Sequence, residues 1–147
     1  MKRPGATLEF ERERNLDLLR AYREQISLQL SNTGQFNNQK AFREVVNMPA
    51  KRFWVSSERA LNVVSLIAKG KTPPMRPTKL AMFQEIYRRV KEERLKHGKV
   101  PLTHIVEIVV AQEAPSFYMT PGTARYFIWK TKRECYEERK RKLRHLY

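Results

Sequence analysis

A short phrase that occurs twice constrains the fold of this chain more than any other feature. The first copy reads Phe53-Trp54-Val55-Ser56, with Ala60 four residues after the serine. Sixty-four positions later the second copy reads Phe117-Tyr118-Met119-Thr120, with Ala124 at the same distance. The residues upstream also correspond, with Val45-Val46 matching Val109-Val110 and Ala50 matching Ala114. Self-similarity at a fixed spacing is typical of repeated supersecondary units. We therefore expect an internal repeat.

Each phrase ends on a residue that suits the start of a helix. Ser56 and Thr120 precede apolar residues at helical spacing, which is the pattern of an N-cap. Pro121 follows Thr120, at the position where the fixed φ of proline favours a helix. Each phrase is thus predicted to join two helices. A helix, a turn and a second helix with a charged outer face form a candidate DNA-reading unit.

Apolar residues at three- and four-residue steps predict about six helices. Their expected ranges are 8–30, 38–48, 57–69, 78–96, 102–112 and 121–145. In the first, the apolar stripe is expected to be Leu16, Leu19, Tyr22 or Arg23, Ile26 and Leu30. The first and fourth helices align loosely, with Tyr22-Arg23 against Tyr87-Arg88. The β-branched run 108–110 is also compatible with a strand, but the spacing of its neighbours favours a helix.

These helices predict an all-α fold of two tandem helix-turn-helix-like repeats related by pseudo-two-fold symmetry. We expect the first repeat over 8–70 and the second over 78–147, with an extended basic C-terminal helix. Residues 71–77 contain three prolines and are predicted to be a short, stiff linker between the repeats. Thr78 is expected to cap the helix that follows. Residues 1–7 carry charge and little to pack, so we expect a basic flexible arm there.

The charge of the chain indicates a polyanionic partner. Thirty Lys and Arg stand against fifteen Asp and Glu, giving a formal charge of +15 and an isoelectric point near 10.3. Lys and Arg that neutralise phosphates release counterions, which favours binding to nucleic acid. The excess is present in both halves of the sequence, so neither half is merely a basic tail.

Few residues point to catalysis, a metal or a cofactor. The one aspartate, Asp17, lies in a charged helix, and no convergent set of carboxylates suited to Mg²⁺ is recognisable. The three histidines lack metal-ligand spacing, and the single cysteine, Cys135, excludes an intramolecular disulfide and a cysteine-based zinc site. We expect a protein that is not an enzyme and uses neither metal nor cofactor. No apolar run of about 18 residues and no secretory signal is present, so we expect a cytoplasmic protein without a membrane partner.

The residues expected to contact nucleic acid follow from the docking of a helix into a groove. After the first phrase, Ser57, Arg59 and Asn62 are placed to face base edges, because Arg can pair with guanine and Asn with adenine. After the second phrase, Thr123 and Arg125 take that place, beside Gly122 and Tyr126. The expected phosphate contacts are Lys51, Arg52, Lys69 and Lys71 in the first repeat, and Lys130, Lys132 and Arg133 in the second.

Two questions stay open at the level of sequence. Arg59 and Arg125 are compatible with reading bases and with contacting phosphates. Trp54 and Tyr118 are compatible with packing at the seam between the repeats and with facing a ligand, and packing is favoured.

The two units resemble helix-turn-helix DNA-binding modules, although the connection over 112–120 is longer than the usual tight turn. With its duplicated phrase and basic C-terminal helix, the chain also resembles short uncharacterised proteins of bacterial prophages and mobile elements. That resemblance implies a genetic setting only. The repeat, the N-capped helices and the charge of +15 lead us to expect a non-enzymatic regulator or accessory factor of a phage or mobile element that binds double-stranded DNA. The alternatives are a phage or mobile-element structural or assembly protein whose helices pack on partner subunits, and an RNA-binding protein.

Overall fold

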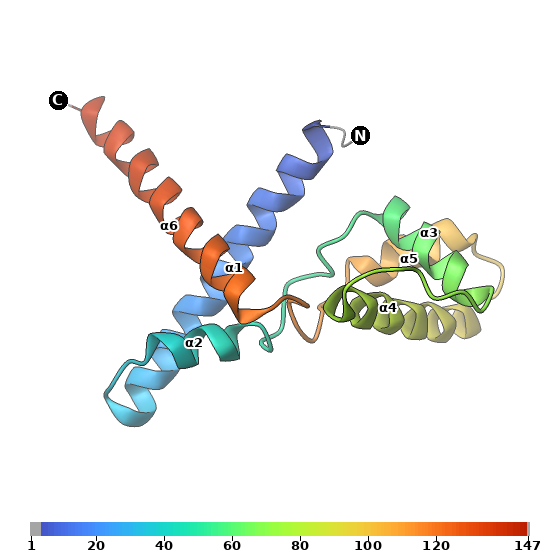
Figure 1. Ribbon diagram of the computed structural model, residues 1–147. Helices are drawn as coiled ribbons and strands as arrows, with labels where there is room; N and C mark the ends of the chain where they lie inside the picture. Colours follow the sequence, from blue (N-terminus) through green and yellow to red (C-terminus); the bar gives the residue numbers. More distant parts are fainter. Residues whose placement is uncertain (1–3, 147) are drawn as a thin grey trace. The chain divides into compact units, whose positions relative to one another are not determined.

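The computed structural model describes residues 4–146, with side chains described from residue 10 onward, and over that range it contains α-helices and no strand (Figure 1). The helices are α1 (Pro4–Thr33), α2 (Asn38–Val45), α3 (Ser57–Ala68), α4 (Pro77–Lys96), α5 (Leu102–Val110) and α6 (Pro121–Arg144). The predicted all-α fold with about six helices is confirmed. Helix α5 includes the β-branched run 108–110, so the strand alternative for that segment is wrong.

The helices form two compact units. The first unit is Met1–Met48 with Thr120–Tyr147, in which α1, α2 and α6 pack on one another. The second unit is Pro49–Met119, in which α3, α4 and α5 pack on one another. This division differs from the expected repeats 8–70 and 78–147.

The third helix of each predicted repeat packs with the first two helices of the other. Helix α3 follows the first phrase but packs on α4 and α5, and α6 follows the second phrase but packs on α1 and α2. The two helices that each phrase joins therefore belong to different units, so neither phrase forms a helix-turn-helix within one unit. The proline-rich segment 71–77 connects α3 to α4 inside the second unit, where a linker between repeats was expected.

The core of the first unit uses both apolar and amide side chains of α1. Leu18, Leu19, Ala21 and Tyr22 are buried there, against Ala41 and Val45 of α2 and Ala124 and Ile128 of α6. The expected stripe is wrong at its two ends, because Leu16 and Leu30 are 40% and 49% exposed.

Two buried glutamines take the place of an apolar continuation of the α1 face. Gln25 Nε2 donates to the carboxylate of Glu44 at 2.6 Å, and Gln29 Oε1 accepts the Asn37 N–H at 2.9 Å. Asn37 is the N-cap of α2, so Gln29 satisfies a donor at the start of that helix. These partners hold α2 in register on α1, although the buried Gln29 Nε2 has no hydrogen-bond partner among the described residues.

The second unit has an apolar core. The buried residues are Ala60, Val63 and Val64 of α3, Met82, Phe83, Ile86 and Val90 of α4, and Ile105, Val106, Val109 and Val110 of α5. On α5 these residues recur at helical spacing and leave Ile108 exposed. One apolar face per helix is what a three-helix unit needs to exclude water.

The helix starts agree with the sequence at both phrases. Ser56 Oγ accepts the N–H of Arg59 at 3.1 Å, and Thr120 Oγ1 accepts the N–H of Thr123 at 3.3 Å, so both predicted N-caps are confirmed. Helix α6 has a proline in its first turn, as expected.

Two other predicted helix starts are wrong. Helix α4 begins at Pro77 with Arg76 at the N-cap and no capping side chain, because proline already supplies the φ that the first turn requires; Thr78 lies inside the helix. Helix α1 begins at Pro4, so residues 4–7 are helical where a flexible arm was expected. Residues 1–3 of that arm lie outside the described residues.

Candidate nucleic-acid interface

The two phrases meet in the second unit. Ala50 and Ala114, which hold equivalent places before the two phrases, exchange backbone hydrogen bonds of 2.9 and 3.0 Å in an antiparallel bridge. The Phe53 N–H donates to the Val110 carbonyl at 3.0 Å. The Phe53 and Tyr118 rings stack with centroids 6.2 Å apart. Tyr118 thus packs on the other copy of the phrase, as the favoured interpretation expected.

Tyr118 is also held in an uncommon backbone conformation. Its φ of 53° is positive, a region that non-glycine residues enter rarely and at a cost in free energy. The Ser116 hydroxyl accepts the Tyr118 N–H at 3.0 Å, which supports this turn. Partial burial, followed by the negative charge of Glu85, raises the pKa of the Tyr118 hydroxyl. The Tyr118 ring therefore takes part in the packing of the second unit, against Phe53.

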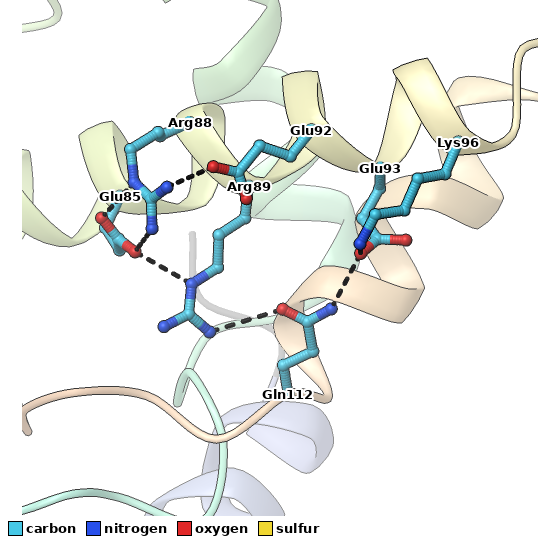
Figure 2. Close-up of polar contacts among 7 residues, drawn as sticks. All are labelled: Glu85, Arg88, Arg89, Glu92, Glu93, Lys96 and Gln112. Carbon is cyan, nitrogen blue, oxygen red and sulfur yellow. Dashed lines mark hydrogen bonds and ion pairs between the residues drawn. The ribbon is translucent and has the colours of Figure 1, made fainter.

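Arg89 of α4 links the segment around the Ala50–Ala114 bridge to α4. Its guanidinium donates to the Glu113 carbonyl at 2.8 Å and to Glu85 at 2.9 Å, and it lies 4.9 Å from the centre of the Phe53 ring. Figure 2 shows Arg89 between Glu85 and Gln112, and Arg88 between Glu85 and Glu92. A hydrogen bond from Arg88, with a second from Arg89, holds the pKa of Glu85 below its ordinary value although partial burial opposes the shift. These two arginines are engaged inside the unit.

The expected contact residues of the first repeat all lie in the second unit, but they are not equivalent. Arg52 donates to the carbonyls of Phe53 and Val55, each at 3.1 Å, and so supports the phrase itself. Ser57 is half-buried in the first turn of α3, while the other members of this set are exposed: Lys51, Arg59, Asn62, Lys69 and Lys71.

Helix α3 carries little net charge of its own. It contains one acid, Glu58, next to one base, Arg59, whose guanidinium lies 6.0 Å from the centre of the Phe83 ring. The structure therefore brings Ser57, Arg59 and Asn62 onto the first half of one helix, but it places them beside a negative charge.

The expected contacts of the second repeat lie in the first unit, and three of them have partners inside it. Lys130 Nζ is 3.8 Å from the Glu11 carboxylate, and Lys132 Nζ is 4.7 Å from the centre of the Tyr22 ring. The Thr123 hydroxyl shares a hydrogen bond of 2.9 Å with the hydroxyl of Thr120. Arg125 and Arg133 remain, and both are exposed on α6.

A row of exposed side chains on α6 went unrecognised in the sequence. It consists of Tyr126, Trp129, Arg133, Tyr136, Lys140 and Leu143, and we call it the outer stripe. These positions alternate steps of three and four residues, so they share one face of the helix. Tyr126, Trp129 and Tyr136 are 58%, 60% and 56% exposed. The spacing was readable in the sequence, but the abundance of charge in this segment obscured it.

The outer stripe pairs aromatic rings with cations. The Arg133 guanidinium lies 5.6 Å from the centre of the Trp129 ring, and Lys140 Nζ lies 4.9 Å from the centre of the Tyr136 ring. Both pairs place the cation four residues after the ring, and the second pair repeats the first seven residues later. Near the start of the helix, Gly122, Arg125, Tyr126 and Trp129 line a shallow hollow of about 270 Å³.

The electrostatics of α6 favour an anion. Pro121–Arg144 contains nine Lys and Arg and three Glu. Among the described side chains, no carboxylate forms an ion pair with Arg125, Arg133 or Lys140. The larger hollow of about 640 Å³ beside α1 is lined by acids and bases together, Arg133 among them, and is crossed by an Arg12–Glu138 ion pair of 2.8 Å. Arg125 and Lys140 lie outside that hollow, so the excess of base on α6 favours phosphate along its exposed face.

No cluster of three or more His, Cys, Asp or Glu side chains suited to a metal ion occurs in the part of the chain that the structure describes. Within residues 4–146, none of the helices combines the length and apolar character that crossing a membrane requires.

No protein-family model matches the sequence, and neither the curated proteins nor the solved structures include a significant match to it.

Proposed function

We propose that this chain is a non-enzymatic, cytoplasmic DNA-binding protein that acts as a regulator or accessory factor, with its principal contact surface on α6. The observation that carries the proposal is a group of three exposed cations, Arg125, Arg133 and Lys140, that have no carboxylate partner among the described side chains. They lie on a helix with nine basic and three acidic residues. A prophage or mobile element as its genetic setting stays a prediction from resemblance.

The proposed contacts are mainly to phosphate. A cation that forms no ion pair within the protein gives up no such pair when it binds DNA, so each phosphate contact gains the full free energy of counterion release. The N-terminal end of α6 adds backbone N–H groups and the positive end of the helix dipole beside Arg125. These features favour affinity for any sequence over the reading of one sequence.

The second unit provides a further, weaker surface in this proposal. Arg59, Asn62 and Lys69 are exposed on or next to α3, but Glu58 opposes a phosphate there. Two binding surfaces in one chain raise the affinity through effective concentration, since the second contact becomes intramolecular once the first has formed.

The test is binding to a fluorescent random 30-base-pair duplex, followed by anisotropy across a salt series. We expect log affinity to fall linearly with log salt concentration. The triple variant Arg125→Ala/Arg133→Ala/Lys140→Ala should reduce that slope by about 3, because three phosphates are then no longer neutralised by the protein. A matched control is Lys130→Ala/Lys132→Ala, which removes charge from the same helix at positions with partners inside the unit.

The control should change the slope much less than the triple variant does. Equal effects of the two variants would show that position on α6 is irrelevant and would contradict the proposed surface. Absence of duplex binding at low salt would overturn the proposal and favour an assembly protein, whose apolar contacts with partner subunits respond little to salt.

A further inference from the structure

We propose that the outer stripe of α6 binds single-stranded nucleic acid by stacking bases on Trp129 and Tyr136. Phosphate binding explains the cations of the stripe but leaves its aromatic residues without a role. Trp and Tyr are large apolar groups, and three of them stand more than half exposed along one face of a single helix. Proteins that bind single strands combine this kind of aromatic surface with basic side chains that follow the backbone.

The geometry of the stripe fits a repeated contact. Trp129 with Arg133 and Tyr136 with Lys140 form the same ring-then-cation pair, and seven residues of helix separate the two rings by about 10 Å along the axis. Each pair offers a ring face for a base and a cation for the adjoining phosphate. Bases in a duplex are already stacked and paired, so only an unpaired strand can use the ring faces.

A stripe with heptad spacing is also typical of a helix that pairs with a second copy of itself. The charges of α6 oppose such a coiled coil. Arg133 and Lys140 would lie in the seam between the two helices, and each helix carries an excess of six positive charges. A coiled-coil seam requires mainly apolar residues at these positions. A polyanion is complementary to the same surface.

This inference does not rest on duplex binding, and its test separates the two. The chain has two tryptophans, so Trp54→Phe leaves Trp129 as the sole reporter. In that background we would titrate a 15-nucleotide oligothymidine and, separately, the 30-base-pair duplex, following tryptophan fluorescence and anisotropy. We expect the single strand to quench Trp129 and the duplex to leave its emission nearly unchanged.

The variants Trp129→Ala and Tyr136→Ala, made in the native background, should each weaken oligothymidine binding by about 5- to 100-fold and change duplex affinity less than twofold. Trp129→Phe should retain most of the single-strand affinity because it keeps a ring. Tyr87→Ala is the matched control: Tyr87 of α4 has Lys91 Nζ 4.6 Å from its ring centre but lies half-buried in the second unit. It should leave single-strand affinity unchanged.

Circular dichroism would verify that each variant keeps its helical content. Unchanged oligothymidine affinity in both Trp129→Ala and Tyr136→Ala would overturn the inference while leaving duplex binding intact. Sedimentation as a dimer that Trp129→Ala dissociates would overturn it in favour of a second copy of the chain. Binding to neither nucleic acid would overturn both proposals together.

Discussion

Ala50 and Ala114 form a reciprocal antiparallel bridge, although sixty-four residues separate them and each precedes one copy of the repeated phrase. Both are almost completely buried. The bridge brings the two connecting segments together within the second unit, next to Phe53 and Tyr118. Corresponding positions therefore meet, an arrangement that accords with the predicted pseudo-two-fold relation, which itself stays a prediction.

The bridge predicts similar sensitivity at its two alanines. Each has about 1% of its surface exposed, so a larger side chain would have to displace packed neighbours. We expect Ala50→Leu and Ala114→Leu each to lower the free energy of unfolding by about 1–3 kcal/mol through overpacking, measured by urea denaturation. Ala111→Leu, at an exposed position after α5, is the control and should have little effect. A large destabilisation at only one of the two bridge positions would contradict the equivalence.

Arg89 is predicted to stabilise the second unit. Replacing it with Met keeps an apolar contact for Phe53 but removes the hydrogen bonds to Glu113 and Glu85. We expect Arg89→Met to lower the free energy of unfolding by about 2 kcal/mol, as is usual for charge-assisted hydrogen bonds. Arg88→Met is the comparison, because Arg88 is solvent-exposed and its pairs with Glu85 and Glu92 are screened by water. A destabilisation by Arg88→Met as large as that by Arg89→Met would show that the network is not anchored through Arg89.

The two phrase caps should contribute alike to stability. Ser56→Ala and Thr120→Ala each remove an acceptor for an N–H in the first turn of a helix, so we expect each to lower the free energy of unfolding by about 1 kcal/mol in thermal or urea unfolding.

Thr78→Ala tests the corrected start of α4. Since Thr78 lies inside the helix behind Pro77, its replacement by alanine should cost nothing and can even stabilise the helix. Destabilisation by Thr78→Ala would restore its predicted role as a cap.

The ion pairs of Glu85 predict a change of stability in acid. Because the folded-state pKa of Glu85 is lowered from its ordinary value of 4.5, its contribution is fully present above pH 4.5 and is lost as the pH falls through the lowered value. The Glu85→Gln variant should be less stable than the native protein at pH 7, and the difference should shrink between about pH 5 and pH 3. Urea midpoints across that range measure it. A gap that stays constant with pH would mean that the charge of Glu85 contributes nothing.

Local features of the chain were predictable from the sequence. Helix periodicity, the N-caps at Ser56 and Thr120 and the proline in the first turn of α6 depend on residues within a few positions of one another. The predictions that were wrong concern burial, which depends on residues far away in the sequence. Gln25 and Gln29 are buried because α2 supplies their partners, and Leu16 and Leu30 are exposed because no helix covers them.

The candidate site divides in the same way. The basic character of α6 is a matter of composition, and its outer stripe follows a spacing that the sequence contains. Which cations remain available is a tertiary property. Only the packing of α6 on α1 places Lys130 near Glu11 and Lys132 over Tyr22, whereas Arg133 lies over Trp129 of its own helix. Arg52 was likewise assigned to phosphate, but the fold engages it with the carbonyls of the first phrase.

The sequence by itself determined that this chain is helical, where most of its helices begin, and that two segments of it are alike. Only the tertiary structure decided which three helices share a core. Helices α3 and α6 carry matching buried positions, Ala60 with Ala124 and Val64 with Ile128, so their local patterns suit either core equally well. Which core each helix joins depends on contacts between residues far apart in the chain. A local pattern of residues does not predict such contacts.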